Sequence, residues 1–224
     1  MTRSARFTDE LRRLAEPIWR AQHDHPFVRG IGAGTVNVEQ FRHWVKQDYL
    51  FLIEYCRLFG LAAARAPDLA TLTQFAQLLT ATATVELELH RGYCREFGIS
   101  EEDLAKEPIS PTARGYTDFL LRVAALGDFS ELAAALLPCM WGYSEIGREL
   151  KARGLPSEPR CRAWIEMYAD PEFAALAEWC RALVDRLGES AADEQRRRMV
   201  DAFLTSSRYE LRFWDMATKL ETWT

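Results

Sequence analysis

The feature that most constrains the fold of this chain is a series of long apolar runs with helical spacing, each preceded by helix-start residues. Asn37 stands three residues before Gln40, and Asp170 directly precedes Pro171. The first amides of a helix have no hydrogen-bond partner inside it. Asparagine and aspartate side chains accept hydrogen bonds from these amides, and proline has no amide proton that needs a partner. Alternating strand patterns closed by Asn-Gly or Asp-Gly are absent. The sequence therefore predicts an all-α protein.

The same spacing sets approximate helix boundaries. Two connections, residues 23–37 with three glycines and a proline and residues 98–111, are expected to lack regular structure. No internal repeat or long linker is present, so residues 1–224 are predicted to form a single domain, a bundle of long helices. The expected helices cover residues 4–23, 38–65, 69–97, 110–126, 129–152, 159–168, 171–188 and 191–220.

The composition is that of a globular protein, with 48% hydrophobic and 27% charged residues among 224. The net charge of −5 argues against nucleic acid or an anionic membrane as partner. The sequence contains no run of about 18 uncharged apolar residues, so no membrane-spanning helix is predicted. The N-terminus also lacks the apolar segment of a secretory leader. The five cysteines lack metal-ligand spacing, which favours reduced thiols and a cytoplasmic protein.

Asp48 lies where the spacing predicts a buried apolar residue. Steps of three and four residues place it on one face of its helix with Trp44, Phe51 and Tyr55. Burying an unpaired carboxylate costs several kcal/mol, on the order of magnitude of a lost core side chain. Asp48 therefore has either a structural hydrogen-bond partner or a functional role.

Glu210 repeats this anomaly in the last expected helix. A carboxyl group in an apolar pocket has a raised pKa, which suits a proton donor. The alternative is a glutamate that reaches past the stripe to pair with Arg208 or Arg212. The other stripe residues are Met199, Phe203, Ser206, Phe213, Trp214, Ala217 and Leu220.

The third polar position is Cys139, in the segment LLPCMWGYSEIG. Cys139 and Tyr143 share the inward face of the 129–152 helix, and Pro138 disrupts that helix one turn back because it lacks an amide proton. Cys139 is either a small buried residue or a nucleophile facing a cavity. A thiol, two carboxylates and tyrosines on long helices together predict a polar, aromatic-lined cavity.

A metal site is not expected. The chain has four histidines and no Glu-x-x-His motif, which argues against a di-iron oxidase. His90 follows Glu86 by four residues, and we expect it to be a structural hydrogen-bonding residue beside the cavity.

Seven motifs, in order, resemble those of the TenA, or thiaminase II, family over nearly the whole chain. They are HPFVRGIGAGTV, FRHWVKQDYLFL, LHRGYC, YTDFL, LLPCMWGYSEIG, WIEMYADPEF and SSRYELRFWDMA. The resemblance implies an all-α, haem-oxygenase-like fold that forms a homotetramer without a cofactor. It also implies an aminopyrimidine aminohydrolase of thiamin salvage. Its substrate would be 4-amino-5-aminomethyl-2-methylpyrimidine, its products the 5-hydroxymethyl compound and ammonia, and thiamin a slower substrate.

The resemblance also implies roles for individual residues. Cys139 corresponds to the nucleophile that adds to the pyrimidine ring, and Glu210 to the acid that protonates the leaving amine. Asp48 corresponds to the residue that hydrogen-bonds the pyrimidine edge.

Five aromatic residues complete the site that the resemblance implies. Tyr116 would lie close to the thiol, Tyr143 and Tyr168 would contact the substrate, and Phe51 and Phe213 would stack on or flank the ring.

Three positions depart from the family. Phe51 stands where tyrosine is frequent, Met140 where many members have an aromatic residue, and Gly142 where they have a bulkier one. These changes bear on the shape of the cavity but not on the nucleophile or the acid. The alternatives are an oxidase related to pyrroloquinoline-quinone synthase, a pyrimidine- or thiamin-binding regulatory protein without turnover, and a purely structural bundle.

Overall fold

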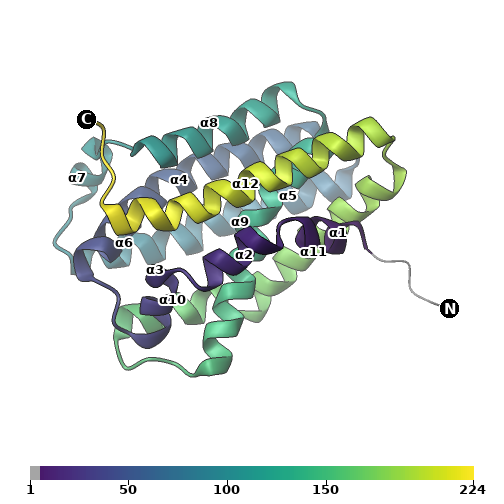
Figure 1. Cartoon of the computed structure of the whole chain (residues 1–224). Coiled ribbons are helices and arrows are strands. Elements are labelled where there is room, and N and C mark those ends of the chain that lie inside the picture. The colour runs from purple at the N-terminus through teal and green to yellow at the C-terminus, as the bar shows by residue number, and fades with distance from the viewer. Residues whose placement is uncertain (1–5) are drawn as a thin grey trace. The chain divides into compact units, whose positions relative to one another are not determined.

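The computed structural model describes residues 6–224, and its regular elements are helices, as Figure 1 shows. The prediction of an all-α protein is confirmed. The chain divides into two compact units. Unit 1 comprises the residues up to Val36 and Ser130–Leu211, and unit 2 comprises Asn37–Phe129 and Arg212–Thr224.

Unit 1 contains the N-terminal helices and most of the C-terminal half of the chain. Its helices are α1 (Phe7–Leu14), α2 (Glu16–His23), α3 (Pro26–Ala33), α9 (Phe129–Arg153), α10 (Pro159–Tyr168), α11 (Pro171–Ser190) and the larger part of α12 (Asp193–Lys219).

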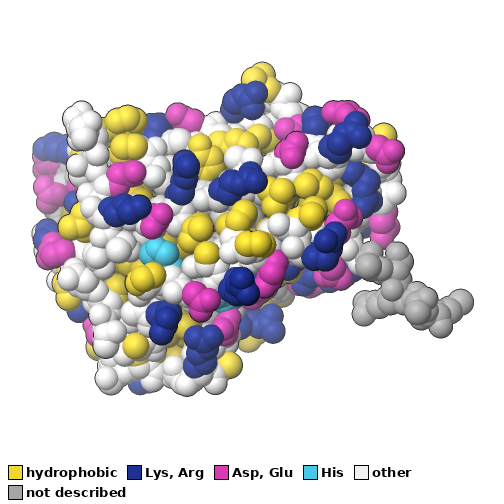
Figure 2. Space-filling model, in the orientation of Figure 1, with side chains coloured by type: hydrophobic (Ala, Val, Ile, Leu, Met, Phe, Trp, Pro, Cys, Tyr) yellow, Lys and Arg dark blue, Asp and Glu magenta, His cyan; other side chains and the backbone are white. Residues whose placement is uncertain are grey.

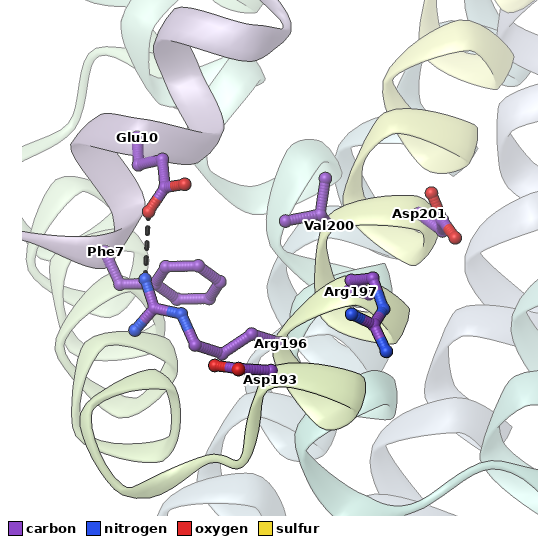
Figure 3. Close-up of a pocket in the computed structure, with 7 residues that line it drawn as sticks. All are labelled: Phe7, Glu10, Asp193, Arg196, Arg197, Val200 and Asp201. Atoms are coloured by element: carbon purple, nitrogen blue, oxygen red, sulfur yellow. Dashed lines mark hydrogen bonds and ion pairs between the residues drawn. The ribbon is translucent and has the colours of Figure 1, made fainter.

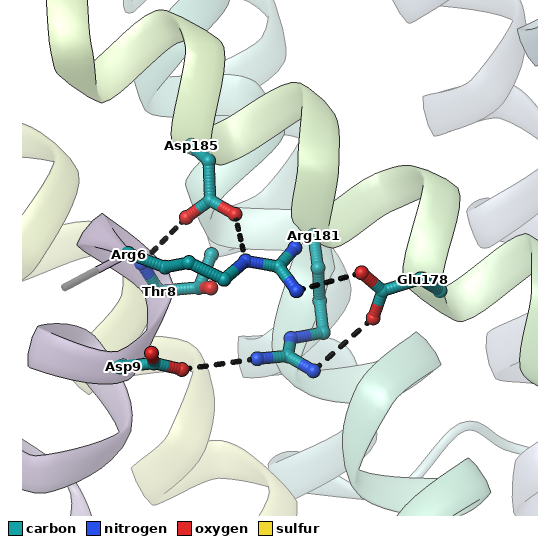
Figure 4. A network of polar contacts seen from close by, with 6 residues as sticks. All are labelled: Arg6, Thr8, Asp9, Glu178, Arg181 and Asp185. Atoms are coloured by element: carbon teal, nitrogen blue, oxygen red, sulfur yellow. Dashed lines mark hydrogen bonds and ion pairs between the residues drawn. The ribbon is translucent and has the colours of Figure 1, made fainter. Parts of the chain in front are cut away.

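A polar network holds α1 on α11 (Figure 4). The nearly buried Asp185 carboxylate accepts hydrogen bonds from the Thr8 amide at 2.8 Å and from Arg6 Nε at 2.5 Å. Arg181 of α11 donates to Asp9 at 3.2 Å. Because a buried carboxylate is stable only when hydrogen-bonded, these contacts fix where the N-terminal helix lies on unit 1.

Unit 2 is built around the 28-residue helix α4. Its helices are α4 (Val38–Arg65), α5 (Leu69–Ala81), the π-helical segment η1 (Thr82–Glu86), α6 (Leu87–Glu96), α7 (Glu101–Lys106), α8 (Pro111–Leu126) and the end of α12.

Two helix starts form as the sequence predicts. The Asn37 side chain accepts from the amides of Glu39 and Gln40 at 2.9 and 3.1 Å. Asp170 accepts from the Glu172 amide at 2.7 Å, and Pro171 occupies the first turn of α11.

Both connections expected to lack regular structure contain a helix, so those two predictions are wrong. In residues 23–37, Pro26 opens α3 after the capping residue His25, and Gly34 ends it in the left-handed conformation with φ of 68°. In residues 98–111, Ser100 and Asp103 form a reciprocal capping box at the start of α7. The prolines and glycines act here as helix boundaries rather than as helix breakers.

Three further boundaries differ from the expected ones. The expected helix 4–23 lies partly outside the described residues, and its remainder is divided at Ala15 into α1 and α2. The expected helix 69–97 contains the π-helical segment η1. Leu220, expected on the buried stripe of α12, lies beyond the end of that helix with φ of 52° and is exposed.

The face of the molecule drawn in Figure 2 has mixed charge. Figure 2 shows Lys and Arg side chains interspersed with Asp and Glu over the face drawn. None of the helices in residues 6–224 is long and apolar enough to cross a membrane.

Two buried glycines of α9 differ in the space around them. A Cβ atom at Gly147 would lie 2.6 Å from the backbone carbon of Tyr168 and 2.8 Å from the nitrogen of Ala169. A Cβ atom at Gly142 would have no atom of the described residues within 4 Å beyond its own helical neighbours. Gly147 therefore sets the approach of α9 to the end of α10, and Gly142 borders empty space.

We expect Gly147→Ala to destabilise the protein by about 1–3 kcal/mol, because the added methyl group must displace backbone. The melting temperature should fall by about 2–4 °C for each kcal/mol. Gly142→Ala is the matched control. It should leave the melting temperature unchanged or raise it slightly, because alanine is a better helix former than glycine. Equal melting of wild type and Gly147→Ala in differential scanning calorimetry would contradict this account.

Candidate functional site

The four predicted residues of unit 1 lie on three of its helices. Cys139 and Tyr143 are on α9, Tyr168 is the last residue of α10, and Glu210 is on α12. Tyr143 and Tyr168 are buried, with ring centroids 4.8 Å apart, and both rings pack on Trp164 at 5.9 and 4.6 Å. The structure therefore brings the two predicted tyrosines together on an aromatic base.

Glu210 is buried, with 2% of its surface exposed, as its place on the stripe predicts. Arg208 and Arg212, the alternative partners considered for it, are both exposed. A glutamate that reached past the stripe to meet them would be exposed with them. The burial favours the interpretation of Glu210 as an interior carboxyl group.

A hydrogen bond one turn before Glu210 fixes how α12 lies on α9. Ser206 Oγ donates to the Ala135 carbonyl at 2.5 Å, and both residues are buried. Glu210 and Cys139 each lie four residues, about one helical turn, further along.

Two other contacts show that α9 and the first part of α12 run in the same direction. Gln195 donates to Ser130 Oγ at 2.9 Å, and Arg198 Nε lies 3.7 Å from Glu131 Oε2. These contacts precede the Ser206–Ala135 bond along both helices. Cys139 and Glu210 both follow this bond along their helices.

Four of the five cysteines have a thiol whose pKa is raised. Cys94, Cys161 and Cys180 are buried, and Cys139 and Cys56 are half-buried. Burial raises the pKa of Cys56 and Cys94 to about 11, and that of Cys161 and Cys180 to about 12. These four thiols are almost entirely protonated at neutral pH, so they are poor nucleophiles.

In unit 2, Asp48 has a definite partner. His90 Nε2 lies 2.7 Å from Asp48 Oδ2, and His90 Nδ1 lies 2.9 Å from the Glu86 carbonyl oxygen. Burial disfavours the charged imidazole, but the hydrogen bond and charge of Asp48 outweigh it and raise the pKa of His90. His90 thus makes the buried hydrogen bonds that were predicted for it.

The remaining predicted residues of unit 2 are aromatic and form one cluster. The Phe51 ring lies 5.1 Å from that of Tyr116 on α8 and 5.5 Å from that of Phe213 on α12. All three side chains are buried. The structure thus brings Phe51, Tyr116 and Phe213 together. Phe51 lies on α4, three residues after Asp48.

Three hollows on the surface of the described residues are lined by residues other than the predicted ones. One of about 360 Å³ lies where α1 meets the start of α12, lined by Phe7, Glu10 and Arg196 among others (Figure 3). Arg196 there bonds Glu10 at 2.9 Å and lies over the Phe7 ring, so its charge is already compensated. Among residues 6–224, no group of three or more His, Cys, Asp or Glu side chains is placed to hold a metal ion.

Sequence reasoning missed the two serines that tie α12 to its neighbours. Ser206 bonds α9, and Ser207 Oγ accepts from Trp19 Nε1 of α2 at 3.0 Å. Ser206 on the buried stripe, with Ser207 next to it in the sequence, was the feature that could have indicated buried hydrogen bonds. Their partners could not be read from the sequence, because spacing predicts a face and not what lies against it.

A family model described as TENA/THI-4/PQQC matches residues 12–220. The chain belongs to this family. An "Aminopyrimidine aminohydrolase" of Halalkalibacterium halodurans is 42% identical over 218 residues, which cover 97% of each chain. The expected membership of the TenA group is confirmed by these similarities.

Solved structures agree on the fold. A "TenA family transcription regulator" from Silicibacter is 32% identical, with a TM-score of 0.87 over 95% of this chain and 96% of that one. A domain from Shewanella denitrificans with a haem-oxygenase-like fold is 14% identical, with a TM-score of 0.74 over 95% of this chain and 92% of that one. The haem-oxygenase-like fold expected from the sequence is confirmed.

We expect iodoacetamide to modify Cys139 before the other four cysteines at pH 8. A thiol with a pKa of about 11 is only about 0.1% ionised at that pH, and the thiolate is the reactive form. Peptide mass spectrometry over time would identify the order of labelling, and Cys139→Ser should remove the fast phase. Labelling of Cys56 first, the other half-buried thiol, would contradict the assignment.

Proposed function

We propose that this protein is an aminopyrimidine aminohydrolase of thiamin salvage. It hydrolyses 4-amino-5-aminomethyl-2-methylpyrimidine to the 5-hydroxymethyl compound and ammonia, and it cleaves thiamin more slowly. The observation that carries the proposal is the 42% identity, over 97% of both chains, to a relative named aminopyrimidine aminohydrolase. The buried polar residues of both units support it, because their chemistry suits this reaction.

Cys139 is the proposed nucleophile. Water cannot displace an amine directly from the aminomethyl group, because that group is not activated. Addition of the Cys139 thiolate forms a C–S bond to the ring and moves a ring electron pair onto nitrogen, which breaks aromaticity. The displaced electrons then expel the amine. Water adds to the exposed carbon, and departure of the thiolate restores the ring.

Glu210 is the proposed acid. The leaving amine must gain a proton as its C–N bond breaks, and a buried carboxyl group can supply that proton. Its burial at 2% exposure supports this role. Glu210 then accepts a proton from the attacking water, so that the group returns to its starting form.

Asp48 is the proposed anchor of the pyrimidine edge, and the aromatic residues bind the ring. Phe51 and Phe213 offer ring faces for stacking, and Tyr116 supplies a hydroxyl group that can favour the thiolate. Tyr143 and Tyr168 are proposed to contact the substrate. Their mutual packing, at 4.8 Å between centroids, supports a preorganised surface.

The assembly and setting are also proposals. We infer a homotetramer, and the exposed face of α5 and η1 supports it. Residues 69–85 contain no charged side chain, and Leu69, Leu72 and Val85 are exposed there. The match of one family model to residues 12–220 supports a single domain, and five cysteines without a disulfide in residues 6–224 support a cytoplasmic setting.

The tetramer predicts a particle of about four times the 25.7-kDa chain mass. Leu69→Lys combined with Leu72→Lys should reduce that mass, because charged side chains would have to be buried in the interface. Sedimentation velocity would measure both proteins. The control is Leu126→Lys at the end of α8, a leucine outside this segment that is about as exposed as Leu69. A monomeric wild type would overturn the assembly.

The test of the function is ammonia release from the aminomethylpyrimidine, with thiamin as a parallel substrate. Cys139→Ser should abolish release while leaving ligand binding in place, and Glu210→Gln should lower kcat by about 10²–10⁴-fold. Cys56→Ser, which changes the other half-buried thiol, is the matched control and should keep full activity. Near-wild-type activity in the Cys139→Ser variant would contradict the covalent mechanism. Binding of both compounds without release would point instead to a regulatory protein.

A further inference from the structure

The Asp48–His90 pair lies in a fully buried setting that limits where its protons can be. Asp48 Oδ2 is 2.7 Å from His90 Nε2, and His90 Nδ1 is 2.9 Å from the Glu86 carbonyl oxygen. His90 has no exposed surface and Asp48 has 3%. The ring of Trp44 packs against the imidazole at 5.3 Å. The imidazole is therefore fixed by two polar partners and an aromatic wall.

The Glu86 contact decides the tautomer of His90. A carbonyl oxygen can only accept a hydrogen bond, so Nδ1 must carry a proton. The contact between Nε2 and Oδ2 then also needs a proton, because two lone pairs at 2.7 Å would repel each other. The pair holds this shared proton either on His90 or on Asp48, and in both states it lies between Nε2 and Oδ2.

The charges around His90 favour the state in which His90 holds it. The charged groups that act on the imidazole are Asp48 of α4 and Glu86 of η1, both acidic. Burial works against the imidazolium, but the hydrogen bond and charge of Asp48 outweigh it and keep the pKa of His90 above its usual value. In either state the other carboxyl oxygen, Oδ1, carries no proton.

Oδ1 is also the oxygen left for a ligand. Among residues 6–224, His90 is the hydrogen-bond partner of Asp48, through Oδ2. A carboxyl group whose proton is confined to its other oxygen can accept a hydrogen bond but cannot donate one. Such a group pairs with an amino group and is repelled by an oxo group or an unprotonated ring nitrogen.

We propose that His90 is a positioning residue that makes Asp48 an acceptor only, and that the pair thereby selects 4-amino- over 4-oxopyrimidines. This inference rests on the proposed function for its ligand class, and it specifies the exocyclic amine as the group that Asp48 binds. A deaminated pyrimidine, which has the same shape and presents oxygen at this position, binds more weakly. The selection acts through the lone pair of Oδ1 and involves no proton transfer to the ligand.

The test is equilibrium binding by calorimetry, with 4-amino-5-hydroxymethyl-2-methylpyrimidine and its 4-oxo counterpart as probes. Neither compound carries the amine that the proposed reaction removes, so turnover does not interfere. Wild type should bind the amino compound at least about 100-fold more tightly, since a buried polar group left facing the wrong partner discriminates strongly. The ratio should stay constant from about pH 6 to about pH 8, because the shared proton remains between the two side chains. Comparable affinities would overturn the inference without any variant.

Two substitutions separate selection from a purely structural role. His90→Leu removes the partner that holds the shared proton at Oδ2, so that a proton on the carboxyl group is no longer confined to that oxygen and can face the ligand. The amino-to-oxo ratio should fall to about 10-fold or less. His90→Gln is the matched control, because its amide can still donate to Oδ2, and its ratio should stay near that of wild type. If both variants weaken both compounds equally, His90 is structural only and the inference fails.

Failure here can be distinguished from failure of the proposed function. Ammonia release without amino selectivity would leave the function standing and remove the role of His90. Amino selectivity without ammonia release would leave the role of His90 standing and remove the hydrolase. Melting temperatures of both variants would identify loss of folding, and the wild-type ratio decides the inference if neither variant folds.

Discussion

A carboxylate buried on α4 constrains much of unit 2. Asp48 can remain in the interior only because His90 reaches it, and His90 is held in turn by the Glu86 carbonyl. That carbonyl belongs to the last residue of a π-helical segment. A π turn adds a residue to the helix and is unfavourable by itself, so it persists where it serves a specific contact. The partner of one buried carboxylate is thus held by the residue that ends the irregular segment η1.

Most of the helical architecture could be predicted because capping is local. Asn37 and Asp170 bond amides two or three residues away, so their role is visible in the sequence. The two missed helices, α3 and α7, are short, and the glycines and prolines around them were interpreted as breakers. The break at Ala15 did have a local signal, because Pro17 lies in the first turn of α2 and cannot continue the preceding helix. The π turn had no signal of this kind.

Less of the candidate site than of the helical architecture could be predicted from the residues alone. Apolar stripes identified Asp48 and Glu210 as buried polar residues, because burial follows from helical period. Similarity to a known family, and not periodicity, supplied the roles of Tyr116, Tyr168 and Phe213. The partner of Asp48 and the serine that ties α12 to α9 came only from three-dimensional structure. A sequence specifies which face of a helix is buried more readily than which residue lies opposite.

The register between α9 and α12 has a consequence for how such a chain can change length. Ser206 and Ala135 are joined, and the residues four positions later on each helix are Glu210 and Cys139. Loss or gain of one residue within 135–139 or 206–210 would rotate the following side chain by about 100° around its helix. The connection 154–158 between α9 and α10 has no such restriction. Insertions and deletions in related chains should therefore collect in the connection and be absent from the two four-residue intervals.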